Sequence, residues 1–379
     1  MTLRLKNRWL LIASLAVGML AFGLYRRSQT SSRFPPPQSF RILETVIEHV
    51  RNDYLEEVDP RRTMEGAYQG LAAALDPLSS YLDKAAVAKY ASPRRTALND
   101  VGAVVTKRPS AFPLVAGVVE GSPAEKAGIQ PGDYLSALDG RSTVGWTLSE
   151  IRWYLKDEAR TPVKIRLIRE NDTREVAVER APLYARPLSW TAEKGTAGIV
   201  KVNHLHPGAA AEFKNTVLPR LAASAGPLIL DLRDCHEGEA AEAAAFINLF
   251  LQAAAIGAFE KKGGFREAVA CPETPVAPDL FLVVWTNAAT LGPAELVAGA
   301  LRELREAKVV GVPTFGLVAK QDLFKLDEGD ALLLTTSAFV LPSGEKLLGK
   351  GVTPDEVVEA GGREAKPYLE KSLRSGTAR

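Results

Sequence analysis

The chain has 379 residues, of which 46% are hydrophobic and 24% are charged, as is typical of globular proteins. A chain of this length corresponds to two or three domains. Lys plus Arg (47) nearly balances Asp plus Glu (45), and the net charge is +2. This balance gives no electrostatic argument for nucleic-acid binding, so we expect no nucleic-acid partner. The two cysteines, Cys235 and Cys271, form at most one bridge, and free thiols are favoured.

The N-terminus predicts a membrane segment. Basic residues flank an uncharged apolar run at residues 9–25, which is near the short end of the length that spans a bilayer. Trp9 and Tyr25 stand at its ends, where interfacial aromatic residues belong. A cleaved signal peptide is the alternative, but no clean small-x-small cleavage site precedes Arg26. We therefore expect residues 1–27 to anchor the chain in a bacterial membrane, with the body outside the cytoplasm on the periplasmic side.

A linker and a helical region follow the predicted anchor. Residues 28–39 are polar and then proline-rich, a composition that predicts a semi-rigid linker. Residues 40–97 carry apolar side chains at helical spacing, and prolines divide the region into short helices.

Residues 98–183 have a β-rich texture in which apolar runs alternate with turn signals. The predicted strands cover residues 101–104, 114–119, 163–168 and 175–178, and the predicted helices cover residues 124–127 and 148–155.

Residues 184–375 alternate between strand and helix patterns, which predicts an α/β core with a buried sheet. The predicted strands cover residues 199–202, 228–232, 280–285, 309–310 and 331–339. The predicted helices cover residues 208–223, 240–255, 293–305 and 368–373. The fold class is therefore expected to be multidomain α/β.

One segment, residues 121–133 (GSPAEKAGIQPGD), is distinctive. Pro123 opens a short helix, Gly128 ends it, and a tight turn at residues 131–133 leads into a strand. Together with its neighbours, this segment resembles a PDZ domain of the bacterial kind. The resemblance implies that a peptide adds as a strand to an exposed sheet edge, so the expected partners are peptide or protein C-termini.

The resemblance also implies which residues bind the peptide. In PDZ domains a hydrophobic-Gly-hydrophobic loop holds the peptide carboxylate with backbone N–H groups, and Gly lets the backbone approach closely. The matching residues in this chain are Val101, Gly102, Ala103 and Val104. The following helix would place Ile151 and Leu155 against the peptide side chain. A purely structural role for this domain is the alternative.

Six further segments, taken in order, are similar to the C-terminal processing peptidases, which are serine endopeptidases with an inserted PDZ domain. They are residues 75–82 (LDPLSSYL), 229–233 (ILDLR), 295–301 (ELVAGAL), 311–316 (GVPTFG), 342–344 (PSG) and 351–355 (GVTPD). The resemblance covers roughly residues 40–375. It implies a Ser-Lys dyad in which burial keeps the lysine neutral enough to take the serine proton.

The positions that match this dyad carry no catalytic group. Gly292 stands at the serine position and Leu317 at the lysine position. Gln321 matches a glutamine of the family and supports the alignment across Leu317. The resemblance also implies two backbone N–H groups that form an oxyanion hole. Pro293 stands at the first of these positions and has no N–H group, and in the loop after residues 231–233, which would supply the second, only Gly238 matches the family. The loss of one oxyanion donor alone costs about a hundred- to a thousandfold in rate. Since the nucleophile and the base are also missing at the matching positions, we expect no catalytic residues here.

Two other pairs are weaker candidates for a relocated catalytic group. Cys235 and His236 are adjacent in the loop near the expected site, but sequence neighbours rarely face each other productively. Thr290 and Lys320 lie near the two dyad positions and define the second pair, but a helix cap at Thr290 and a solvent-exposed Lys320 are the favoured interpretation.

Two histidines raise the question of a metal. His204 and His206 lie two apart on an expected strand and would share a face, but no third ligand with suitable spacing stands out. We therefore expect no metal and no cofactor.

These observations predict a membrane-anchored PDZ protein that binds peptide or protein C-termini without cleaving them. It would act as an adaptor, a decoy or a regulatory partner of an active peptidase relative. The main alternative is an active serine-type endopeptidase with a relocated catalytic group. A purely structural envelope protein is a third interpretation.

Overall fold

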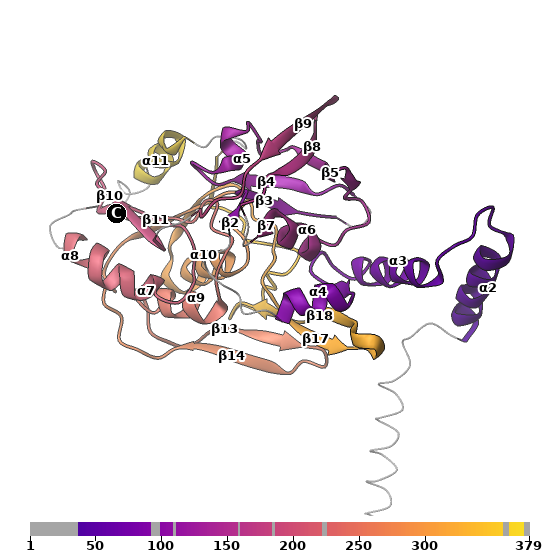
Figure 1. Ribbon diagram of the computed structural model, residues 1–379. Helices are drawn as coiled ribbons and strands as arrows, with labels where there is room; N and C mark the ends of the chain where they lie inside the picture. Colours follow the sequence, from indigo (N-terminus) through magenta and orange to yellow (C-terminus); the bar gives the residue numbers. More distant parts are fainter. Residues whose placement is uncertain are drawn as a thin grey trace, which may run out of the picture. The chain divides into compact units, whose positions relative to one another are not determined.

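The computed structural model describes residues 37–91, 99–108, 111–157, 160–183, 186–221, 226–358 and 364–374 (Figure 1). The chain divides into two compact units, Met1–Met64 and Glu65–Arg379, and the boundary falls inside helix α3 (Pro60–Ala73). The predicted anchor at residues 9–25 lies outside the described residues. Within the described ranges, no helix is both long enough and apolar enough to cross a membrane.

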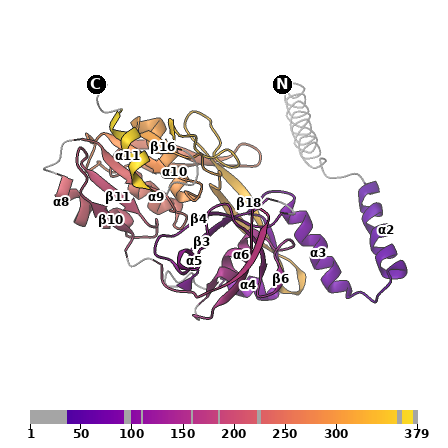
Figure 2. The same ribbon diagram turned by 90° about the horizontal axis from the view of Figure 1, so that it is seen from above.

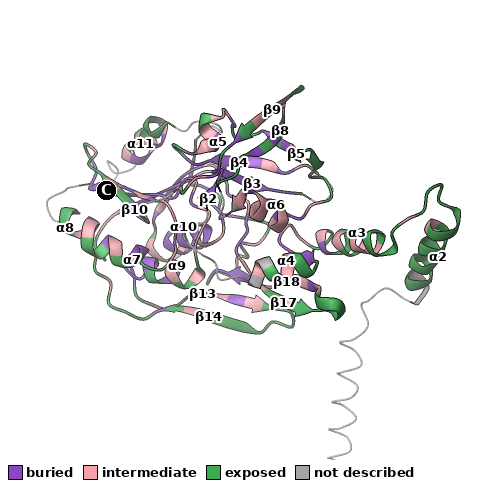
Figure 3. Cartoon of the chain, in the orientation of Figure 1, coloured by how far each residue is buried: buried purple, intermediate pink, exposed green. Residues whose placement is uncertain are grey.

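The first unit contains helix α2 (Pro37–Asp53) and the start of α3. Because α2 begins at Pro37, the prediction of a linker through residue 39 is wrong at its last three residues; proline is tolerated in the first turn of a helix. Large apolar side chains of α2, including Phe40 and Ile42, are exposed (Figure 3). Asp59 accepts a hydrogen bond from Arg61 N (2.9 Å) at the start of α3.

The second unit is built around a six-stranded sheet with the order β10-β11-β12-β15-β16-β19. Its strands are β10 (Leu188–Thr191), β11 (Gly198–Val202), β12 (Leu228–Asp231), β15 (Leu282–Thr286), β16 (Lys308–Gly311) and β19 (Glu356–Val357). All neighbouring pairs are parallel except β10 with β11.

Both faces of this sheet are buried, which explains the unbroken apolar run in β12. Leu228 and Leu230 belong to the larger apolar core on one face, together with residues of the helices. Ile229 faces the other way and packs with Trp285 and with Tyr368 of the last helix. The helices of this region are α7 (Ala209–Glu212), the π-helix η1 (Phe213–Val217), α8 (Leu218–Leu221), α9 (Ala240–Ile247), α10 (Pro293–Arg305) and α11 (Ala365–Arg374) (Figure 2).

A second sheet of the same unit is antiparallel, with the order β1-β18-β13-β14 and with β17 also paired to β18. Its strands are β1 (Ser80–Leu82), β13 (Ala253–Lys261), β14 (Arg266–Cys271), β17 (Ala319–Lys325) and β18 (Ala331–Val340). The short elements beside it are α4 (Lys84–Ala91) and the 3₁₀-helix η2 (Asp327–Gly329).

Two sequence predictions are wrong in this sheet. The alanine-rich segment 240–255 is helical only to Ile247, and its last residues begin β13. Pairing of β13 with β14 and β18 overrides the local helix propensity of alanine. The region predicted as helical also contains a strand, β1, because Ser80–Leu82 pairs with β18.

The PDZ-like sheet has the order β3-β4-β5-β8-β9, with β6 paired to β5. Its strands are β3 (Ala103–Thr106), β4 (Leu114–Val118), β5 (Tyr134–Leu138), β6 (Arg141–Ser142), β8 (Val163–Arg169) and β9 (Asp172–Val178). Helices α5 (Pro123–Lys126) and α6 (Leu148–Leu155) complete the domain, and β2 (Asn99–Asp100) pairs with β7 (Lys156–Asp157) beside it. The predicted strand at residues 101–104 is therefore interrupted at Val101 and Gly102.

The local sequence explains the turn between α5 and β5. The Ser122 hydroxyl caps α5 by accepting a hydrogen bond from Glu125 N, and Pro123 occupies the first turn. The fully buried Asp133 accepts a hydrogen bond from Gln130 N (2.9 Å) and pairs with Arg169 (2.6 Å). A single carboxylate thus closes the turn and fixes it to β8.

Candidate functional site

The positions that the family resemblance assigns to catalysis lie on loops at the carboxyl ends of β12, β15 and β16. Loops at this edge of a parallel sheet are where α/β proteins place their ligands. Two of the loops are tied together, because Asn287 accepts a hydrogen bond from Asp234 N (3.0 Å) and donates one to Asp234 Oδ1 (2.9 Å). Leu291 N also donates to the carbonyl of Cys235 (3.0 Å).

Glu295 connects the loops after β15 and β16. Its wholly buried carboxylate accepts hydrogen bonds from Gly292 N (2.8 Å), Thr314 Oγ1 (2.5 Å), Gly316 N (2.6 Å) and Leu317 N (2.7 Å). Burial raises the pKa of this carboxyl group, and the hydrogen bonds from Thr314 and the backbone oppose that rise. The carboxylate therefore holds together the two loops in which the family places its nucleophile and its base.

Gly292 is the N-cap residue of α10 and has φ +58° and ψ −117°. This conformation is strained for a residue with a side chain. Space for a side chain is present, because a Cβ atom built there meets only the Leu317 carbonyl oxygen, at 3.8 Å. The backbone at this position is thus a half-buried turn between a strand and a helix, as in nucleophile elbows, but without a reactive atom.

Leu317 is buried and apolar. It belongs to the same apolar cluster as Leu291, Ala289 and residues of the PDZ-like domain, including Val104. A leucine side chain cannot accept a proton, so this position supplies packing between the core and the PDZ-like domain.

The two positions where the resemblance places oxyanion N–H donors do not both carry such a donor. Pro293 is the first residue of α10 and has no N–H group. Gly238 forms an isolated parallel bridge with Leu205, and a Cβ atom at Gly238 would lie 2.5 Å from the Leu205 carbonyl oxygen. Gly238 therefore allows close backbone contact with the neighbouring segment.

Cys235 and His236 do not form an activated pair. Burial raises the pKa of the Cys235 thiol to about 12, which leaves almost no thiolate near neutral pH. His236 Nδ1 is 2.8 Å from the carbonyl oxygen of Asp234, and burial lowers the pKa of this imidazole. Cys235 and Cys271 are both free and buried, in agreement with the sequence prediction.

Thr290 and Lys320 are engaged elsewhere. The buried Thr290 hydroxyl donates to the Leu232 carbonyl (2.9 Å) and accepts from Asn287 N (2.9 Å). Thr290 thus closes the loop after β15, and Gly292 rather than Thr290 caps α10. Lys320 Nζ lies on β17, 2.8 Å from Glu267. Neither contact brings the hydroxyl and the amine together.

His204 and His206 follow β11 rather than lying on it, with ring centroids 5.0 Å apart. Burial lowers the pKa of His204 to about 4, and His206 contributes to the decrease. Within the described ranges, no group of three His, Cys, Asp or Glu side chains is placed to hold a metal ion.

The PDZ-like domain packs directly on these loops within the second unit. A Cβ atom at Gly117 of β4 would lie 2.4 Å from Ala289 Cβ and 2.9 Å from Asp234 Oδ1. Only glycine allows this approach, so β4 covers the loops that carry Asp234 and Ala289. This contact was not predictable from the sequence, since Gly117 lies in an ordinary strand pattern.

All six residues assigned to peptide binding are buried: Val101, Gly102, Ala103, Val104, Ile151 and Leu155. Strand β3 stands at one end of the order of its sheet, as peptide addition requires. Gly102 has φ +85°, and a Cβ atom there would lie 2.3 Å from Ser122 Cβ, so the loop requires glycine.

A charged cluster also joins the PDZ-like domain to the core. Lys156 of β7 contacts Glu237 of the loop after β12, and its ammonium nitrogen lies 3.6 Å from Asp100 Oδ2. His206 and His236 approach Glu237 at 3.9 and 3.6 Å. Burial alone would raise the pKa of Glu237, but Lys156 and His236 outweigh it and lower this pKa from 4.5 to about 2.

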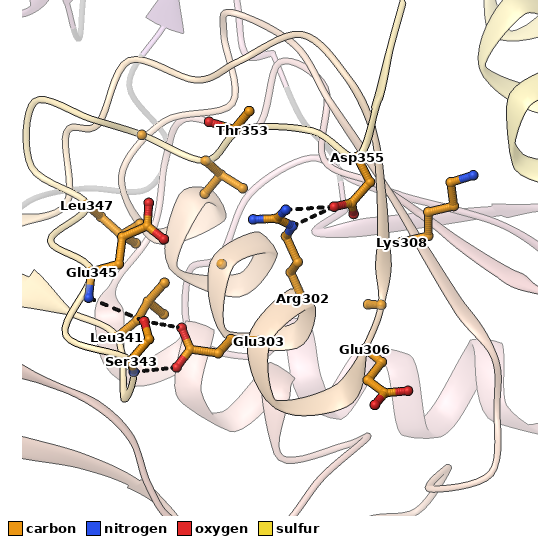
Figure 4. A pocket seen from close by; sticks show the side chains of 14 residues that line it. Arg302, Glu303, Glu306, Lys308, Leu341, Ser343, Glu345, Leu347, Thr353 and Asp355 are labelled. Atoms are coloured by element: carbon orange, nitrogen blue, oxygen red, sulfur yellow. Dashed lines mark hydrogen bonds and ion pairs between the residues drawn. The ribbon is translucent and has the colours of Figure 1, made fainter.

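A separate cavity of about 590 Å³ lies beside the C-terminal half of α10, away from its N-cap (Figure 4). Part of its polar lining is paired within the cavity: Arg302 contacts Asp355 (2.7 Å), and Glu303 accepts from Ser343 Oγ (2.7 Å). The cavity was not predicted from the sequence, because its lining comes from segments far apart in the chain.

Comparison with known proteins supports this organisation. Residues 196–358 match the profile of peptidase family S41, and residues 114–169 match the PDZ domain. Probable CtpA-like serine proteases of Staphylococcus haemolyticus (strain JCSC1435) and Staphylococcus aureus (strain COL) are 26% identical over 84% of this chain. The alignments span 64% of the length of these relatives.

A solved structure agrees with the fold. The photosystem II D1 C-terminal processing protease aligns with a TM-score of 0.71 at 22% sequence identity, covering 89% of this chain and 91% of that protein. The predicted resemblance is thereby confirmed: this chain is similar to the C-terminal processing peptidases, with one region that matches peptidase family S41 and another that matches the PDZ domain.

Proposed function

We propose that this chain binds peptide or protein C-termini through its PDZ domain and does not cleave them. The observation that carries the proposal is the set of residues at the N-cap of α10 and beside it. Gly292 has no nucleophilic atom, Leu317 has no basic atom, and Pro293 has no N–H group. In analogous hydrolases, loss of the nucleophile leaves a residual acceleration of only about 10³–10⁴ over water.

The geometry of the alternative groups supports the same proposal. The Cys235 thiol is buried and protonated near neutral pH. Thr290 and Lys320 each bond to a different partner. An endopeptidase with a relocated catalytic group therefore finds no support in the described contacts.

The proposal places the chain at a membrane. The apolar run at residues 9–25, flanked by basic residues, would anchor it, with the body on the periplasmic side of a bacterial membrane. An active peptidase relative in the same compartment is the partner that a non-cleaving member of this family would regulate or supply with substrates.

Binding and cleavage are tested together in one experiment. The full chain in detergent is mixed with a fluorescent peptide that ends in apolar residues and a free carboxylate, and with the same peptide amidated. We expect saturable binding of the free-carboxylate peptide, weaker binding of the amidated one, and an intact peptide by mass spectrometry after incubation. Equal binding of both peptides, or no binding, would contradict the PDZ assignment.

The anchor is tested separately, by extraction of membranes with alkaline carbonate and by protease treatment of intact spheroplasts. We expect the chain to stay in the membrane fraction and its body to be digested from outside. Release by carbonate, or protection from the protease, would contradict the proposed location.

A further inference from the structure

Charged groups of the chain itself lie where, by the PDZ resemblance, a peptide would bind. The first is Asp100, immediately before the carboxylate loop. Its Oδ1 atom accepts a hydrogen bond from Gly102 N at 2.8 Å, and the carboxylate is largely buried. A carboxylate therefore already occupies the glycine N–H group that, by the resemblance, would hold the terminal carboxylate of a peptide.

The second group is Arg152 on helix α6. Its Nη2 atom donates to the carbonyl of Val105 at 3.2 Å. Val105 lies on β3, the strand to which a peptide would add, and a peptide strand would pair with backbone groups of β3. The Val101 N–H group also donates to the Leu155 carbonyl at the end of α6 (3.4 Å). Two hydrogen bonds within the domain thus hold α6 to β3 and to the residues just before this strand.

The third element fixes Asp100 in place. Lys156 lies 3.6 Å from the other carboxylate oxygen of Asp100 and also contacts Glu237 in the core. Backbone pairing of Asp100 with Ala181, in both directions at 2.9 and 3.0 Å, adds to this restraint. The position of Asp100 is therefore linked to the loop after β12.

From these contacts we infer that the PDZ groove is self-occupied: Asp100 acts as an internal competitor for the peptide carboxylate, and Arg152 covers the edge of β3. A C-terminal peptide binds only by displacing the Asp100 carboxylate from Gly102 N and by moving α6 away from β3. Displacement of Asp100 also loosens Lys156 from its position between Asp100 and Glu237. This inference rests on the proposed function, since it describes how peptide binding at that site is restrained.

The test compares peptide affinities of full-length variants. Asp100→Ala removes the internal carboxylate, and Asp100→Asn keeps an oxygen that accepts from Gly102 N but removes the charge. We expect Asp100→Ala to bind the free-carboxylate peptide about tenfold more tightly or better, because one hydrogen bond to a charged group no longer has to be broken. Asp100→Asn should gain less, and neither variant should gain affinity for the amidated peptide.

Two controls separate competition from a change in charge. Asp172→Asn removes a carboxylate from the exposed strand β9 of the same domain and should leave the affinity unchanged. Asp100→Ala combined with Lys156→Met should keep the gain, whereas a gain caused by an unmasked lysine would disappear. Thermal unfolding of each variant shows that the compared proteins are folded.

The outcomes distinguish the inference from the proposed function. If the unmodified chain binds the free-carboxylate peptide as tightly as both Asp100 variants, self-occupation is wrong and the proposed function stands. If the gain is as large for the amidated peptide, or vanishes without Lys156, competition by Asp100 is also wrong. If no variant binds either peptide, the proposed function itself fails.

Discussion

Replacement of Glu295 by alanine tests whether one carboxylate holds together the two loops that match the family's catalytic loops. The side chain accepts hydrogen bonds from three backbone N–H groups and one hydroxyl, all within 2.8 Å. Each buried donor left without a partner costs about 1–3 kcal/mol. Because the loops can shift to recover some partners, we expect the free energy of unfolding to fall by at least about 3 kcal/mol.

The assay is urea unfolding of the full chain in detergent, followed by tryptophan fluorescence. Glu295→Gln keeps one accepting oxygen but turns an amide group toward the N–H donors, so we expect an intermediate loss. Glu239→Ala, an exposed glutamate before α9 without a side-chain cap bond, is the matched control and should change stability by no more than about 0.5 kcal/mol. A loss below about 1 kcal/mol for Glu295→Ala would refute the bridging role.

Three further predictions follow from other parts of the site. Gly292→Ala should lower the free energy of unfolding by about 1–3 kcal/mol, because alanine is strained at the positive φ of this position. Gly145→Ala is the control, since this glycine has open space and no positive φ, and equal effects of the two changes in urea unfolding would contradict the strain. Because the pKa of Glu237 is lowered, its contribution to stability is present above pH 4.5 and is lost as the pH falls toward 2. Glu237→Gln should therefore make the free energy of unfolding less dependent on pH in that window, by an amount that solvent screening reduces because the side chain is 31% exposed. An unchanged acid-unfolding profile would refute this prediction. Cys235 and Cys271 should react with a thiol reagent at pH 8 only upon unfolding, because burial raises the pKa of these thiols to about 12 and about 11; rapid labelling of the native chain would contradict their burial.

Local chemistry made parts of this fold predictable from the sequence. Ser122, Pro123 and Asp133 form a cap and a turn from residues close in the chain, so their pattern indicated the PDZ-like turn directly. The strand at Leu228–Asp231 was predictable because both of its faces are buried and its apolar run is unbroken.

Contacts between distant segments were not predictable in this way. The alanines that open β13 have a high helix propensity, and only pairing of this segment with β14 makes them a strand. The packing of Gly117 against Ala289 and the link from Lys156 to Glu237 join residues separated by long stretches of chain. The residue types at positions 292 and 317 were visible from the sequence alone, whereas the contacts of Asp100 and Arg152 required coordinates.

The most direct test of the central claim is hydrolysis of a denatured protein by the full chain in detergent, with products identified by mass spectrometry. We expect no cleavage above that of a heat-inactivated sample, because Gly292 and Leu317 supply neither a nucleophile nor a base. Cleavage that co-purifies with the chain and is lost on Thr290→Ala or Lys320→Ala would contradict it and would show that the catalytic group has moved.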